Sequence, residues 1–268
     1  MNRLIKTVIL CAVMLAFVIP HSVMAASGQL TATDLSAFEK TASAAEKPIS
    51  DKMRALLHDL VLLQEEERDW EAKFKAVRYR NEESFIEIRK LIKLIEAEKL
   101  NKLENQVKQT RERYQPLFQA YSTLNQQISA ARRLKNKELI LVLRSQADVM
   151  KAAVQLARQD VRSKEAALRA VKAAKAAKVK KIRGILGETE TIQVQIKETK
   201  NSISMLNKQA SPIWSNFKLA VRQNNARSTS DSLSALVSII RRTVNYTKDI
   251  HALEQKISGI LVKAKEQF

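Results

Sequence analysis

The sequence has few of the residues that break helices and few of those that build compact enzyme sites. Its 268 residues include only four glycines, four prolines and one cysteine, and aromatic residues make up 5%. Four glycines cannot supply a glycine-rich phosphate-binding loop, and no nucleophile motif surrounds any serine. A lone cysteine excludes an intramolecular disulfide and a Cys-based metal site. We therefore expect no enzymatic activity, no cofactor and no small-molecule substrate.

Histidine is scarce as well, with three residues in the chain. His58 and His251 are far apart in the sequence, and neither has a second ligand at a helical spacing. Metal sites need several such ligands brought together. We expect no bound metal and interpret both histidines as surface residues.

Long apolar runs are absent too. The longest, Val8–Ile19, has 12 residues (8 to 19), whereas a membrane span needs about 20. It follows Arg3 and Lys6, and Pro20 ends it five residues before Ala25. This pattern predicts that residues 1–25 are a secretory signal peptide cleaved after Ala25, with an uncleaved anchor as the alternative. We expect a protein that is secreted or associated with the cell envelope, outside the cytoplasmic membrane.

A long heptad repeat dominates the remaining sequence. From Ile140 to Ala220, seam residues recur at alternating steps of three and four, and all but a few are apolar. The only charged residues on this seam are Lys164, Lys175 and Lys178. We predict an all-α fold, an elongated antiparallel coiled coil or helical bundle of four long helices.

Turn signals place these helices at about 51–80, 83–134, 137–223 and 229–267, after a flexible arm over 26–49. The first turn is read from Arg80-Asn81-Glu82-Glu83. A four-residue shift of the heptad after Ile95 is interpreted as a stutter within the second helix. The arrangement predicts a three-helix section followed by a two-helix section that meet at Gly184 and Gly187. The chain either continues straight through these glycines or folds back there.

Short turns between long helices imply antiparallel neighbours, which fixes the expected register. Turns centred at 81/82 and at 135/136 place Glu67 level with Glu96, and Glu96 level with Lys175, with Lys178 nearby. We therefore predict a buried layer of these four charged residues, which lowers stability but fixes helix order.

Positive charge is concentrated in the third predicted helix. The net charge is +19, or +17 without Arg3 and Lys6. Residues 158–183 include ten basic residues but only two acidic ones, Asp160 and Glu165. One interpretation is neutralisation by acids of the first two helices, Glu65, Glu66, Asp69, Glu71, Glu96 and Glu98. The other is a surface that binds polyanions. Its candidate residues are Arg158, Arg162, Arg169, Lys172, Lys180, Lys181 and Arg183.

These features favour an exported, non-enzymatic coiled-coil protein of the bacterial cell envelope, with a structural or adaptor role. An envelope protein or a second copy of the chain is the expected partner, and an anionic wall polymer or lipid surface is a candidate ligand of the basic residues. Nucleic acid is not the expected ligand of an exported protein. The alternative is a helical regulator or activator of an envelope enzyme such as a cell-wall hydrolase.

Overall fold

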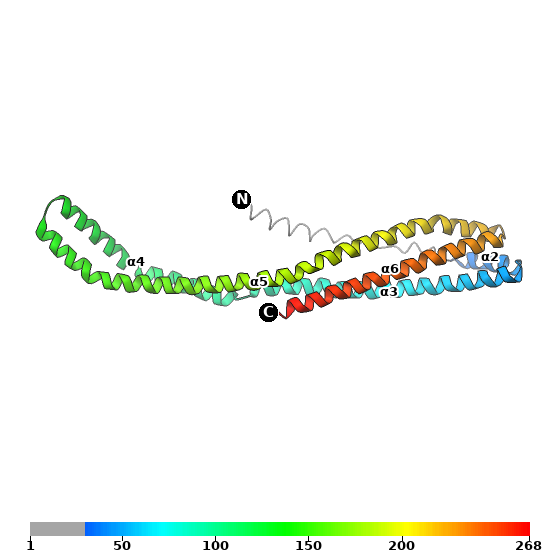
Figure 1. Cartoon of the computed structure of the whole chain (residues 1–268), viewed down its shortest axis with the longest axis horizontal. Helices are drawn as coiled ribbons and strands as arrows, with labels where there is room; N and C mark the ends of the chain where they lie inside the picture. The colour runs from blue at the N-terminus through cyan, green and yellow to red at the C-terminus, as the bar shows by residue number, and fades with distance from the viewer. Residues whose placement is uncertain (1–29) are drawn as a thin grey trace. The chain divides into compact units, whose positions relative to one another are not determined.

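The computed structural model describes residues 30–268, which are 93% helical and contain no strand. The elements are α2 (Ala32–Ser43), α3 (Lys47–Leu94), α4 (Ala97–Arg133), α5 (Lys137–Arg222) and α6 (Ala226–Lys265) (Figure 1). Four long helices confirm the predicted all-α bundle. The predicted signal peptide and its cleavage site lie outside the described residues.

Helix α5 follows the heptad seam for its whole length. Every predicted seam position from Ile140 to Ala220 is buried or half-buried. The helix has 86 residues and continues unbroken through Gly184, Gly187 and Pro212. The alternative of a fold-back at the two glycines is therefore not seen in this helix.

The predicted turn at Asn81 is wrong, because α3 continues as a helix to Leu94. Asn81 is 4% exposed, and its Oδ1 accepts a hydrogen bond of 2.6 Å from Ser258 Oγ of α6. The polar residue that resembled a helix stop is thus a buried contact between helices. The break falls instead at Glu96, whose φ of 53° is left-handed. That position is where the heptad shifts its phase.

The described residues divide into two compact units, 30–80 with Thr191–Ile257 (unit 1) and Asn81–Glu190 with Ser258–Phe268 (unit 2). In unit 1, α3 and α6 run parallel, since Asp59 pairs with Arg241 and Glu66 with Lys248. Helix α5 is antiparallel to both, and the three helices share one apolar core. Its members include Met53, Leu60, Phe217, Val221, Leu233, Leu236 and Ile240.

Helix α2 packs on unit 1, so the prediction of a flexible arm is wrong for residues 30–49. Thr31 and Asp34 form a reciprocal capping box that starts the helix. Phe38 and Ala42 are fully buried in the unit 1 core. Thr41 Oγ1 donates a hydrogen bond of 3.0 Å to the carbonyl oxygen of Val221 in α5. Ion pairs of Asp34 with Lys218 and of Glu39 with Arg54 add to these contacts, which together dock the short helix.

Unit 2 consists mainly of α4 and the first part of α5, which lie antiparallel and side by side (Figure 1). Lys135 turns the chain with a φ of 55°, and Asn136 Oδ1 accepts a hydrogen bond from the Leu139 N–H at the start of α5. The predicted turn at 135–137 is confirmed. The buried core between the two helices is small, with Leu124, Ile128 and Ala147 at its centre.

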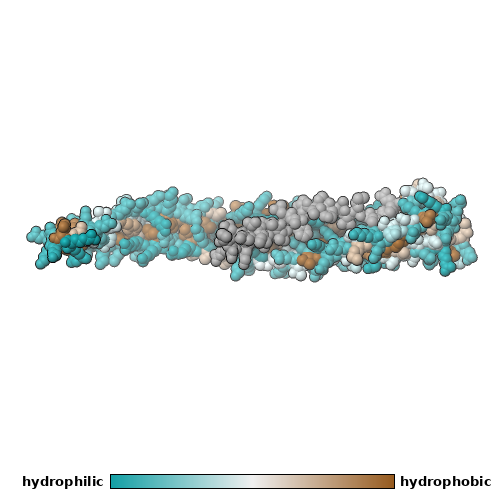
Figure 2. All heavy atoms as spheres, turned by 90° about the horizontal axis from the view of Figure 1, so that it is seen from above, coloured by the Kyte–Doolittle hydropathy of each residue, from teal (hydrophilic) through white to brown (hydrophobic). Residues whose placement is uncertain are grey.

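Much of the visible surface is hydrophilic, with hydrophobic residues scattered between (Figure 2). Within residues 30–268, no helix carries an apolar stretch long enough to cross a membrane.

Candidate functional site

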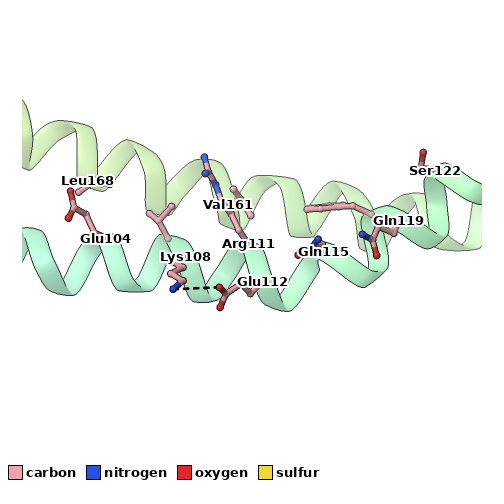
Figure 3. A pocket seen from close by; sticks show the side chains of 11 residues that line it. Glu104, Lys108, Arg111, Glu112, Gln115, Gln119, Ser122, Val161 and Leu168 are labelled. Carbon is pink, nitrogen blue, oxygen red and sulfur yellow. Dashed lines mark ion pairs between the residues drawn. The ribbon is translucent and has the colours of Figure 1, made fainter.

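Four candidate polyanion-binding residues, Arg158, Arg162, Arg169 and Lys172, lie on the part of α5 that packs against α4 in unit 2. Lys180, Lys181 and Arg183 follow on the same helix. An open groove of about 840 Å³ runs between these two helices there (Figure 3). Val107, Phe118, Val161 and Leu168 give it an apolar floor. Charged and amide side chains of α4 form its rim, namely Glu104, Lys108, Arg111, Glu112, Gln115 and Gln119.

The two acids inside the basic run are paired with arginines of α4. Arg111 Nε donates a hydrogen bond of 3.1 Å to Glu165, and Arg113 Nη2 lies 2.8 Å from Asp160 Oδ2. The hydrogen bond from Arg111 lowers the pKa of Glu165 below its usual value. Tyr114 also donates a hydrogen bond of 3.1 Å to Asp160. Both acids therefore form ion pairs with α4, although they lie among the basic residues of α5 in the sequence.

Charge compensation in unit 2 is consequently incomplete. The unit holds 26 Lys and Arg residues against 14 Asp and Glu residues, which gives +12 of the +19 of the chain. Helix α4 alone has seven basic and three acidic residues, a net charge of +4. The helix beside the basic run thus adds positive charge to it.

The candidate residues fall into two groups. Lys172 pairs with Glu104 of α4 at 2.7 Å, and Arg169 pairs with Glu165 at 3.8 Å. The positive charge of Arg162 also helps to lower the pKa of Glu165. The others are exposed and form no ion pair with any described residue. They are Arg158, Lys180, Lys181 and Arg183.

Three of the six acids expected to neutralise the basic run have other partners. Glu66 contacts Lys248 at 2.6 Å and Glu71 contacts Lys75 at 2.8 Å, both within unit 1. Glu96 pairs with Lys99 of its own helix at 3.7 Å. The neutralisation found in unit 2 comes from Glu104 of α4, which pairs with Lys172, and from Glu165 of α5, which pairs with Arg169.

The predicted register layer of Glu67, Glu96, Lys175 and Lys178 is wrong. It requires a hairpin at Asn81, whereas α3 continues for 27 residues beyond Glu67 to Leu94, about 40 Å of helix. Glu67 is buried in unit 1, whereas the Glu96 side chain is exposed in unit 2. Lys175 and Lys178 are half-buried in α5, and Lys178 Nζ donates a hydrogen bond of 2.8 Å to the Phe268 carbonyl oxygen.

Glu67 nevertheless sits in a polar layer of unit 1. It is 8% exposed, and burial together with the nearby Glu71 carboxylate raises its pKa to about 7, although Arg68 opposes the rise. Gln64, one turn earlier on α3, is 6% exposed. The heptad position of Glu67 revealed its burial, but the sequence did not reveal its neighbours.

Among residues 30–268, His58 and His251 do not belong to a candidate metal site. His58 is exposed, while the ring of His251 packs edge-on against Trp70 with 5.2 Å between centroids. Within the described part of the chain, no three His, Cys, Asp or Glu side chains are grouped so that they could hold a metal ion.

Comparison of the chain with protein-family models, with curated proteins and with solved structures finds no match.

Proposed function

We propose that this protein is an exported, non-enzymatic coiled-coil adaptor of the bacterial cell envelope, retained there by anionic polymers that bind the basic residues of unit 2. The observation that carries the proposal is the pairing of Asp160 and Glu165 with arginines of α4. Because both acids pair with α4, they leave the exposed cations Arg158, Lys180, Lys181 and Arg183 of α5 without a neutralising partner among the described residues. The export step is supported by the sequence of residues 1–25.

An extended row of cations suits a polymer of phosphate groups better than a small anion. Arg158 and Arg183 are 25 residues apart on one helix, about 38 Å. Exposed charges of this kind attract a polyanion over roughly 8 Å at physiological ionic strength, so the binding should be salt-sensitive. Wall teichoic-type polymers, lipopolysaccharide and anionic lipid head groups all present such phosphate.

The test measures binding of the chain from Ala26 onward to isolated cell walls and to anionic and neutral lipid vesicles. We expect binding to walls or anionic vesicles that weakens at least tenfold between 50 and 300 mM salt, values chosen to span the screening range. The variant Lys180→Glu/Lys181→Glu/Arg183→Glu should reduce it by about tenfold or more.

A matched control makes the same change of charge in unit 1, at the exposed residues Lys197, Lys208 and Arg227. Equal loss in both variants would show that net charge, rather than the unit 2 surface, is responsible. Absence of binding to any anionic surface would refute the proposal. Recovery of one stoichiometric envelope enzyme at high salt would favour the regulator instead.

A further inference from the structure

One stretch of unit 2 is free of charge, although the rest of the unit is strongly basic. Helix α4 has no Asp, Glu, Lys or Arg from Tyr114 to Ala131, 18 residues or about 27 Å of helix. Across the whole chain, 28% of residues are charged. Leu124 and Ile128 of this stretch are buried against α5, but most of its other side chains are exposed. The stretch is therefore a charge-free surface.

Helix α5 presents an apolar stripe beside this stretch. Val142, Val149 and Leu156 are 56%, 77% and 67% exposed, and their spacing of seven residues puts them on one side of the helix. This is not the buried seam, because Val154 lies about 140° around the helix from Val149 at 100° per residue. A second heptad stripe on an exposed side of a coiled-coil helix predicts a further packing partner.

Over residues 142–156, the charged residues of α5 lie beside the stripe or on the opposite side of the helix. Glu138 lies one turn before the stripe begins at Val142. By the same geometry, Asp148 lies about 100° from Val149, and Arg144, Lys151 and Arg158 lie about 140° to 180° away. Asp160 follows the end of the stripe and is already paired with Arg113.

The stripe and the charge-free stretch meet in one groove. Val149 and Met150 of α5 line a hollow of about 620 Å³ together with Ala120, Thr123, Leu124 and Gln127 of α4. We define the uncharged face of unit 2 by six side chains on the two helices. They are Ala120, Thr123, Gln127, Val142, Val149 and Leu156.

We propose that the uncharged face binds the same face of a second copy of this chain, so that two α4–α5 hairpins form a four-helix bundle. Two copies of a unit with a charge of +12 repel each other, and they can approach closely only where neither carries charge. Apolar, hydroxyl and amide side chains are also self-complementary, as a two-fold interface requires. Because the core between α4 and α5 is small, packing against two further helices would stabilise the hairpin.

The area is sufficient for a specific but moderate dimer. A face of about 27 Å by two helix widths of about 10 Å offers roughly 500 Å² on each chain. The two copies together would bury about 1,000 Å², near the lower bound of specific interfaces. We therefore expect dissociation in the micromolar range. This assembly is independent of polyanion binding, because it uses none of the candidate basic residues.

Sedimentation velocity of the chain from Ala26 onward tests the proposal. We expect a monomer–dimer equilibrium that shifts toward dimer as salt screens the repulsion between the two copies. Val149→Lys should raise the dissociation constant at least tenfold. The matched control, Val194→Lys on α5 in unit 1, where Val194 is 55% exposed, should leave it unchanged. A monomer at 100 µM, a concentration well above the expected range, overturns the proposal, as does a dimer that Val149→Lys does not weaken.

Single-cysteine cross-linking provides a second test, in which the variant keeps the net charge of the chain and does not need to disrupt the interface. The chain from Ala26 onward has no cysteine, so Val149→Cys introduces the only one. Because Val149 lies at the middle of the face, mild oxidation should join two copies through a disulfide. Val194→Cys should give little product. Equal cross-linking of the two variants, or cross-linking of Val149→Cys mainly to another protein in cells, contradicts a second copy as the occupant.

Discussion

Asn81 of α3 and Ser258 of α6 are joined by a hydrogen bond of 2.6 Å, although 177 residues separate them in the sequence. Both belong to unit 2, where α6 contributes only its last residues. Heptad seams repeat similar apolar residues, so two helices can shift their register by one repeat with little loss of free energy. A buried polar pair cannot slide, because each partner would lose its hydrogen bond.

We predict that Asn81→Ala lowers the free energy of unfolding by about 1–3 kcal/mol, because the amide is buried and bonded. A double-mutant cycle with Ser258→Ala should give a coupling energy of about 0.5 kcal/mol or more, measured by urea unfolding. Glu83→Ala, an exposed change two residues along α3, is the control and should alter stability by less than about 0.5 kcal/mol. A coupling energy near zero would show that the contact does not set the register.

Glu67 predicts a pH dependence of stability. Its pKa is raised in the folded chain from an ordinary 4.5 to about 7, so the folded state binds more protons than the unfolded state between these values. The free energy of unfolding should therefore fall as pH rises from 4.5 to 7 and level off above. Glu67→Gln should remove this part of the pH dependence and stabilise the chain at pH 8 by on the order of 1–3 kcal/mol.

The control for Glu67 is Glu65→Gln, an exposed residue of the same helix. Its unfolding free energy, measured at pH 5 and pH 8, should follow that of the unmodified chain. Parallel curves for Glu67→Gln and the unmodified chain would contradict a protonated carboxyl at this site.

The left-handed backbone at Glu96 predicts two opposite effects of glycine. A φ of 53° is strained for glutamate and relaxed for glycine, so Glu96→Gly should stabilise the chain by about 0.5–1 kcal/mol. Glu98→Gly, in the first turn of α4, should instead destabilise it by about 1 kcal/mol. Thermal unfolding followed by circular dichroism compares the two. Destabilisation by both would mean that the helix does not break at Glu96.

The docking of α2 predicts a large effect at Phe38, which is fully buried in the unit 1 core. Phe38→Ala should cost about 3–5 kcal/mol, or the free energy of docking α2 if that is smaller. Leu35→Ala, at a position 39% exposed on the same helix, should cost less than about 1 kcal/mol. Urea unfolding and the rate of proteolysis near residue 44 report these effects. A wild-type rate in Phe38→Ala would show that α2 does not depend on this contact.

Sequence patterns were sufficient for the helical class, the seam of α5 and the turn at 135–137. The break expected between 223 and 229 also holds the left-handed residue Asn224, whose φ is 51°. Each depends on local information, either a repeat of seven residues or a polar turn between two repeats. The turn assigned to Asn81 failed because a polar residue at a buried position can serve a distant partner as well as end a helix. Only the location of Ser258 distinguishes the two, and it is 177 residues away.

The candidate site was predicted only in part for a related reason. The excess of cations on α5 is a property of composition and could be counted. Which acids face them depends on register, and the misplaced first turn assigned the wrong ones. Arg111 and Arg113 of α4 carried no special signal, because their role follows from lying beside Glu165 and Asp160.

Gly184 and Gly187 sit in α5 where an added Cβ would meet nothing within 4 Å. No close approach or turn requires them, yet each lowers local helix stability by about 1 kcal/mol relative to alanine. The backbone amides around these residues should consequently exchange their hydrogens with solvent faster than those of the helix on either side. A helix of 86 residues thereby contains a compliant segment at which thermal bending concentrates, and alanine at both positions would stiffen it without disturbing any packed side chain.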